Sequence, residues 1–349
     1  MDDQSAPSCG LPFARPERVL MAHGGGGRMM QQLIAEVFEK ALAPQGLHID
    51  HDSAVFAPPP GRLAFTTDSY VVRPRFFPGG DIGKLAVIGT VNDLAMSGAR
   101  PLALSLSVIL EEGLAIAELE RIVASVAAAA RECEVAVLTG DTKVVERGKG
   151  DGIYLNTAGI GAVEHSLHIH PSSVRSGDAV LVSGDLGRHG MAVMALREGL
   201  EFANPIESDC APLYPLVRDL LAAGIQVRCL RDLTRGGLAS ALNEIAVSAC
   251  KCVAVDEERI PVHDSVRGAC ELLGLDPLYV ANEGRMVAFV PPEQVEPALT
   301  VLRRHPQGAA AAAIGQVTAQ PQGLVSLTSR IGVARVLDLL SGEQLPRIC

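Results

Sequence analysis

The sequence has few aromatic residues and no tryptophan. Aromatic residues make up 3% of its 349 residues, although 48% are hydrophobic and 20% are charged. We therefore expect a core built mainly from Ala, Val, Leu and Ile. This composition excludes an intrinsically disordered chain, and the length is sufficient for two domains of ordinary size.

The sequence also lacks an apolar run of roughly 20 residues, the length that a membrane-spanning helix needs. Its start, MDDQSAPSCG, has neither the basic residues nor the apolar stretch of a signal peptide, which predicts a cytoplasmic protein. A formal net charge of -10 argues against nucleic acid or a membrane surface as a partner. A chain of this length without an export signal is expected to keep its eight cysteines reduced and not to form a disulfide framework. They form no CxxC pair, so the indication of a zinc site is weak.

Strand-like and helix-like segments alternate along the chain, which predicts a mixed α and β fold. Residues 62–68 and 135–142 have the pattern of strands that end in polar residues, and residues 81–99 that of a helix with an acidic cap. A stretch rich in His, Ser and Pro, EHSLHIHPSSVRSGD, separates two similar halves.

These patterns predict four parts of the chain. They are a flexible N-terminus over 1–20, a first domain over 21–165, a second α/β domain over 170–335, and a mobile tail over 336–349.

Five aspartates stand at polar boundaries beside small residues: Asp52, Asp68, Asp93, Asp141 and Asp232. Carboxylates are ligands suited to Mg²⁺, which binds one or two of them together with substrate phosphates. Their convergence would form a metal-phosphate site, whereas each alone is equally well explained as a cap or turn residue. Asp93 is the hardest to explain as a cap, because it lies inside the predicted helix, where an unpaired carboxylate is costly to bury.

A glycine run, HGGGGRMM, precedes the helical stretch QQLIAEVFEKAL. Glycines allow backbone N–H groups to turn toward an anion at a helix start. The run matches neither a P-loop nor a dinucleotide fingerprint, and a flexible segment is the alternative interpretation.

Lys143, Glu283 and Cys349 are the remaining candidates for chemistry. Lys143 beside Asp141 is either a surface ion pair of little energetic value or, in a cleft with Glu283, part of a pair that neutralises charge and moves a proton. Cys349 is either an incidental residue or a thiol that visits a pocket and leaves it, with Arg347 favouring its thiolate form.

Several of these motifs occur together in one known family. HGGGG, FFPGGDIGKLAVIGTVNDLAMSGA, LTGDTK, DLTRGG, ANEG and the final PRIC resemble the HypE family of hydrogenase maturation factors, over nearly the whole chain. The resemblance implies the two-domain α+β fold of aminoimidazole ribonucleotide synthetase-like proteins, as a homodimer whose N-terminal sheets pair into a barrel.

The resemblance also implies a reaction. The carbamoyltransferase HypF would place a carbamoyl group on the C-terminal cysteine, and this chain would dehydrate it to a thiocyanate with ATP and Mg²⁺. The HypC–HypD complex would then accept the cyano group for the iron of [NiFe]-hydrogenase.

Carried onto this sequence, the resemblance assigns roles to individual residues. It implies metal ligands at Asp52, Asp68, Asp93 and Asp232. It implies nucleotide contacts from Gly25, Gly26, Gly27, Asp68, Asn92, Asp93 and Asp141. Lys143 would stabilise charge on the carbamoyl oxygen or phosphate, Glu283 would remove protons from the nitrogen, and Cys349 would carry the substrate. The rival interpretations are a selenophosphate synthetase and a carrier without catalytic activity.

Overall fold

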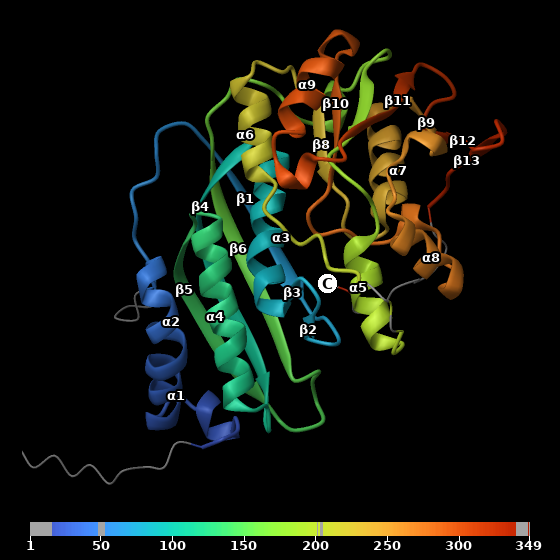
Figure 1. Cartoon of the computed structure of the whole chain (residues 1–349). Coiled ribbons are helices and arrows are strands. Elements are labelled where there is room, and N and C mark those ends of the chain that lie inside the picture. Colours follow the sequence, from blue (N-terminus) through green and yellow to red (C-terminus); the bar gives the residue numbers. More distant parts are fainter. Residues whose placement is uncertain (1–15, 48–52, 201, 203–204, 340–347, 349) are drawn as a thin grey trace, which may run out of the picture.

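The computed structural model describes residues 16–47, 53–200, 202, 205–339 and 348. Two β-sheets with their helices form two adjacent parts, the N-terminal part in blue to green and the C-terminal part in yellow to red in Figure 1. The mixed α and β content predicted from the sequence is confirmed.

The N-terminal part is built on a four-stranded sheet in the order β1-β6-β4-β5. Its strands are β1 (Arg62–Tyr70), β4 (Ala99–Glu111), β5 (Ala136–Val145) and β6 (Ile153–Val163). β4 and β5 are parallel, whereas β6 pairs antiparallel with both β1 and β4. β1 and β5 are therefore the two edges of this sheet.

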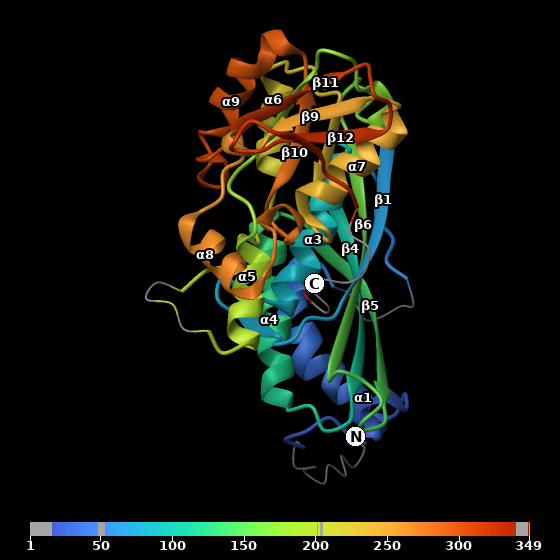
Figure 2. The same ribbon diagram turned by 90° about the vertical axis from the view of Figure 1, so that its right-hand side faces the viewer.

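Two helices, α3 (Ile82–Met96) and α4 (Ile116–Glu132), pack on one face of this sheet, as Figure 2 shows. The short hairpin of β2 (Phe76–Phe77) and β3 (Gly80–Asp81) leads into α3, where the Asp81 carboxylate accepts hydrogen bonds from the N–H groups of Gly83 and Lys84. The helix predicted over 81–99 is thus present, with its acidic cap.

A helical segment precedes the first strand of this sheet in the sequence and packs on α4 and β5. It comprises η1 (Met21–Gly24), α1 (Arg28–Leu33), the π-helical η2 (Ile34–Glu39), α2 (Lys40–Leu42) and η3 (Ala43–Gln45).

The C-terminal part contains a seven-stranded sheet in the order β13-β12-β9-β11-β7-β10-β8. All its pairs are antiparallel except β12 with β9. The strands are β7 (Ala179–Val182), β8 (Cys229–Asp232), β9 (Cys252–Asp256), β10 (Met286–Val290), β11 (Ala312–Thr318), β12 (Leu324–Thr328) and β13 (Ala334–Val336).

Alternation along the central strands buries both faces of this sheet. In β10, Val287 and Phe289 join the apolar cluster under α7, whereas Met286 and Ala288 join the one under α6 and α9. The helices are α5 (Arg188–Arg197), α6 (Tyr214–Ala222), α7 (Gly237–Ala249), α8 (Asp264–Leu273) and α9 (Val295–Leu302). Short 3-10 turns are η4 (Pro171–Ser173), η5 (Glu257–Arg259), η6 (Pro277–Tyr279), η7 (Pro292–Gln294) and η8 (Pro306–Gly308).

Two residues of the predicted tail over 336–349 are buried. Leu337 is fully buried in the C-terminal core, and its N–H donates to the Val325 carbonyl. Ile348 belongs to the buried apolar cluster of the N-terminal part. None of the helices in the described residues is long and apolar enough to cross a membrane.

Candidate active site between the two sheets

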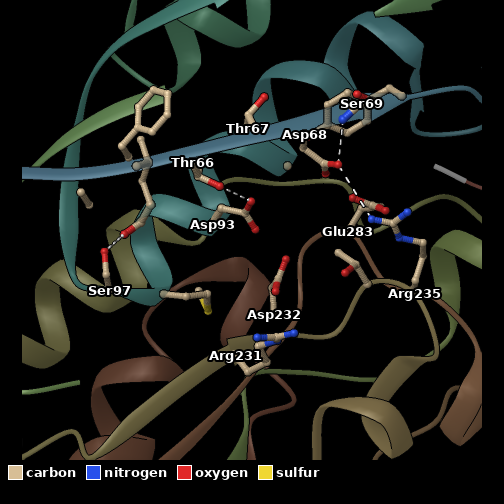
Figure 3. A pocket seen from close by; sticks show the side chains of 17 residues that line it. Thr66, Thr67, Asp68, Ser69, Asp93, Ser97, Arg231, Asp232, Arg235 and Glu283 are labelled. Atoms are coloured by element: carbon tan, nitrogen blue, oxygen red, sulfur yellow. Dashed lines mark hydrogen bonds and ion pairs between the residues drawn. The ribbon is translucent and has the colours of Figure 1, made fainter. Parts of the chain in front are cut away.

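A cavity of about 550 Å³ lies where the N-terminal and C-terminal parts meet. One side is formed by residues 64–70 of β1 and the end of α3, and the other by the end of β8 and the loop that follows it. Figure 3 shows Asp68, Asp93 and Asp232 around this space, with Arg235 and Glu283 beside them. Segments far apart in the sequence thus bring carboxylates together.

The alternation of β1 selects which side chains enter the cavity region. Thr66, Asp68 and Tyr70 are more buried than Thr67 and Ser69 between them, because successive strand residues point to opposite faces. The Thr66 hydroxyl donates to Asp93 Oδ2 at 2.9 Å. Asp93, which lies inside α3, therefore has a hydrogen-bond partner on β1. Asp68 accepts from the Ser69 N–H at 2.8 Å.

Crowding of carboxylates marks the cavity electrostatically. Burial, opposed by the Thr66 hydrogen bond and reinforced by the Asp68 charge, raises the pKa of Asp93. Burial and then the Asp93 charge raise the pKa of Asp232 to about 7. The cationic side chains nearby are Arg231 and Arg235, whose guanidinium lies 3.9 Å from Asp68. A bound cation would relieve this repulsion.

The donor set fits a metal that takes part of its coordination from elsewhere. Within the described ranges, no three His, Cys, Asp or Glu side chains are close enough to hold a metal ion by themselves. Mg²⁺ usually keeps several waters and takes only one or two carboxylates along with phosphate oxygens. Asp68, Asp93 and Asp232 can supply such a pair of carboxylates.

Glu283 is buried, with 3% of its surface exposed, and lines the cavity from the loop before β10. Asp209 fixes this loop by accepting hydrogen bonds from the N–H groups of Glu283 and Gly284, at 3.3 and 3.2 Å. A Cβ at position 284 would lie 2.0 Å from the Asp209 carbonyl oxygen. Glycine at this position therefore allows the close approach that holds Glu283 in place.

Asn92, which the resemblance implies as a nucleotide contact, is hydrogen-bonded to the Glu283 loop. Its side chain is buried, and its amide group donates to the carbonyl oxygens of Glu283 at 3.0 Å and Ala211 at 3.2 Å. Its Oδ1 accepts from the Leu213 N–H at 2.8 Å. Because these bonds occupy the side chain, Asn92 supports the Glu283 loop and does not line the cavity.

Lys143, Asp141 and the glycines at 25, 26 and 27 form a second group at the β5 edge of the N-terminal sheet. Lys143 Nζ lies 3.5 Å from Asp141 Oδ2, and both side chains are more than half exposed. Gly25, Gly26 and Gly27 are exposed beside η1, which packs on β5. None of the five lines the cavity. Within one chain, this group therefore lies apart from the carboxylates at the opposite edge of the sheet.

Two predicted site residues, Asp52 and Cys349, lie outside the described residues. Sequence reasoning also missed residues that the structure places at the site. Tyr70 lines the cavity, and burial, followed by the Asp68 charge, raises its pKa well above the usual value. The alternation of β1 was a signal for Tyr70, which shares a face with Asp68. No local pattern indicated Asp209.

Comparisons with known proteins agree with this architecture. Residues 50–163 match the N-terminal domain model of AIR synthase related proteins, and residues 175–327 match the C-terminal domain model. The chain is 54% identical to a carbamoyl dehydratase HypE of Azotobacter vinelandii, over 95% of this chain and 97% of the relative. The chain belongs to the HypE family.

Solved HypE structures have the same fold. A crystal structure of a HypE in complex with ATP superimposes with a TM-score of 0.89 at 47% identity, covering 95% of this chain and 99% of that one. The HypE of a HypE–HypF complex superimposes with a TM-score of 0.77 at 42% identity, covering 90% and 100%. The resemblance to HypE and the two-domain α+β fold predicted from the sequence are therefore confirmed.

Proposed function

We propose that this chain is an ATP-dependent carbamoyl dehydratase that converts an S-carboxamide on Cys349 into a thiocyanate. The observation that carries the proposal is the cavity between the two sheets, where Asp68, Asp93 and Asp232 face Glu283. It occurs in a chain 54% identical to a carbamoyl dehydratase HypE and 47% identical to a HypE solved with ATP. The carboxylates would hold Mg²⁺, which would neutralise the ATP phosphates.

The chemistry requires activation of a poor leaving group. The carbamoyl oxygen of R–S–C(=O)–NH₂ attacks the γ-phosphorus of ATP, ADP leaves, and one N–H proton is lost to give an O-phosphorylated imidate. Loss of the second N–H proton then expels phosphate and forms the C≡N bond. The reaction consumes ATP and releases ADP and phosphate. Two protons leave the nitrogen, and the expelled phosphate takes up one of them to become HPO₄²⁻. The slow steps need positioned charges and a base.

Glu283 is suited to remove the protons from nitrogen. It is the cavity carboxylate on the loop fixed by Asp209 and Asn92, so its backbone position is held from two sides. A base held by hydrogen bonds to its supporting loop loses little freedom on reaction. The three aspartates line the cavity from both of its sides, Asp68 and Asp93 from β1 and α3 and Asp232 from the end of β8, and a cation between them would offset their charges.

We further propose that a homodimer completes the site. The face of the N-terminal sheet opposite α3 and α4 exposes Leu63, Phe65 and Ile109, with 50%, 72% and 40% of their surfaces accessible. Lys143 pairs in register with Ile109 and is exposed. Pairing of two such faces would bury apolar surface and carry Lys143 and the glycine loop of one subunit to the cavity of its partner.

The remaining partners follow from the same proposal. HypF would supply the carbamoyl group, since a HypE–HypF complex is known for a 42% identical chain. The HypC–HypD complex would accept the cyano group, and the reaction would take place in the cytoplasm.

The deciding experiment is the intact mass of the protein after incubation with HypF, carbamoyl phosphate and ATP, beside Cys349→Ala. The proposal requires the mass of one carbamoyl group to appear on the wild type, and one water then to be lost only with ATP at this protein's own site. Cys349→Ala should gain nothing yet still bind ATP. A carbamoyl gain that never loses water would identify a carrier instead.

Glu283→Gln tests the assigned base. The variant should fold, bind ATP and accept the carbamoyl group, but dehydrate it about 10²- to 10⁴-fold more slowly, the usual contribution of a positioned acid–base group. Dehydration is followed by the loss of one water in single-turnover mass measurements. Glu164→Gln, on the exposed linker, is the matched control. Wild-type turnover in Glu283→Gln would remove Glu283 from the mechanism.

A further inference from the structure

His189 occupies a position that the proposed reaction does not explain. It lies in the first turn of α5, is fully buried, and packs edge-to-face against the Phe77 ring at 5.3 Å between centroids. Its Nε2 lies 2.9 Å from the carbonyl oxygen of Ile348, and its Nδ1 lies 2.9 Å from the Ser208 hydroxyl. A residue 159 positions away in the sequence is thus held by this ring.

The bonding partners fix the tautomer of the His189 ring. A carbonyl oxygen only accepts, so Nε2 carries the proton that it donates to Ile348. Burial lowers the pKa of His189, which keeps the ring neutral, so Nδ1 accepts from the Ser208 hydroxyl. The Ser208 oxygen in turn accepts from the Cys210 N–H at 3.1 Å. The chain Ser208–His189–Ile348 is therefore oriented in one direction.

The Ile348 side chain is buried as well as its carbonyl. Only 3% of its surface is exposed, and it belongs to the same apolar cluster as Phe77, Val193, Cys210 and Ala281. Two interactions thus hold Ile348. Its side chain buries apolar surface, and its carbonyl oxygen accepts a directional hydrogen bond.

The support of His189 is shared with Glu283. Asp209 Oδ1 accepts from the N–H of His189 at 3.1 Å and from the N–H of Glu283 at 3.3 Å. The N–H of Gly190 donates to the Ala281 carbonyl at 3.0 Å, two residues before Glu283. The ring that holds Ile348 and the loop that carries Glu283 therefore belong to one hydrogen-bonded unit.

We propose that His189 is a positioning residue that anchors the C-terminal segment through the Ile348 carbonyl, so that Cys349, the next residue, is presented to the loop of Glu283. Ser208 sets the ring tautomer, and Asp209 ties the anchor to the catalytic loop. The role in presenting substrate rests on the proposed function, whereas the anchoring itself does not.

The anchor is tested by the rate at which iodoacetamide labels Cys349, relative to the exposed Cys250 in the same sample. His189→Gln places an amide N–H near the position of Nε2, whereas His189→Asn places one near Nδ1. The Cys349/Cys250 ratio should rise about three- to tenfold in His189→Asn, as expected for loss of one hydrogen bond, and stay near the wild-type value in His189→Gln. Equal ratios in all three proteins would overturn the proposal.

A variant in the C-terminal segment covers the case in which substitutions of the buried ring impair folding. Ile348→Asp keeps the His189 ring and its Ser208 partner and should raise the same ratio, because a carboxylate is costly to bury in the apolar cluster that holds Ile348. An unchanged ratio would show that the segment is not docked in solution and would refute the anchor. Ser208→Ala should raise the ratio less than His189→Asn, because the ring keeps its direct bond to Ile348.

Turnover separates the anchor from the proposed function. In His189→Asn, carbamoyl transfer from HypF should proceed normally and ATP affinity should not change. Dehydration should slow about three- to tenfold, the same factor as the expected rise in the labelling ratio. If the wild type never dehydrates its carbamoyl group, the proposed function fails while the labelling ratio still decides the anchor. If dehydration proceeds in His189→Asn at the wild-type rate despite faster labelling, presentation to Glu283 is refuted.

Discussion

Asp232 shows how a single residue couples the cavity to pH. It ends β8 at an edge of the C-terminal sheet, where burial and the nearby Asp93 carboxylate raise its pKa to about 7. The folded protein therefore binds more protons than the unfolded chain between about pH 4 and pH 7. Stability contributed by protonated Asp232 is present at low pH and is lost as pH rises through 7.

Asp232→Asn should remove this dependence, since an amide does not ionise. We compare the free energy of unfolding of the variant with that of the wild type, in the absence of Mg²⁺. The variant minus wild-type difference should be about 1–3 kcal/mol more positive at pH 8 than at pH 5. Urea unfolding at the two pH values measures it. A pH-independent effect of Asp232→Asn would contradict the expected loss of stability as Asp232 ionises.

At the scale of secondary-structure elements, the packing of α3 on α4 depends on a glycine. A Cβ at Gly83 would lie 2.4 Å from the Ile122 carbonyl oxygen, a backbone atom of α4 that cannot turn away. The Asp81 cap fixes the start of α3 at the same place. The two helices therefore approach closely where α3 begins, and this sets the position of Asp93 three turns later.

Gly83→Ala should lower the free energy of unfolding by about 1–3 kcal/mol, the usual cost of overpacking. Gly268→Ala in α8 is the matched control, because the added Cβ meets nothing within 4 Å outside the backbone of its own helix. That variant should gain up to about 1 kcal/mol from the better helix propensity of alanine. Thermal or urea unfolding compares them, and equal stabilities would show that α3 and α4 adjust to the extra methyl group.

The predicted elements agree with the structure where local sequence decides them. The alternation in β1 and the capped helix α3 could be recognised because their signals lie within a few residues. The surroundings of Asn92 could not be recognised in this way, since nothing nearby in the sequence indicates that residues 211, 213 and 283 surround it.

At the scale of the whole molecule, the separation of the candidate site residues is the main feature. The carboxylates lie at the β1 edge and Lys143 at the β5 edge of the same sheet, with β6 and β4 between them. One chain does not bring the two groups together, whereas a dimer with two-fold symmetry could unite them twice.

Mixing two inactive variants tests this arrangement. Lys143→Ala and Asp68→Asn should each abolish dehydration alone, because every site then lacks one group. When the two variants are refolded together, half of the dimers contain one subunit of each. Each mixed dimer has one intact site out of two, so about a quarter of wild-type activity should return. Activity is measured as thiocyanate formed per subunit. No recovery, with mixed dimers demonstrated by differently tagged subunits, would place both residues within one chain.

The sequence by itself determined the family, the two-part α+β organisation and the local elements. These follow from periodicity, caps and motifs whose residues are near one another along the chain. Only the tertiary structure decided that β1 and β8, more than 150 residues apart, enclose one cavity. It also decided that Asn92 supports the Glu283 loop and that His189 holds Ile348. Long-range packing brings these groups together, and no local propensity encodes it.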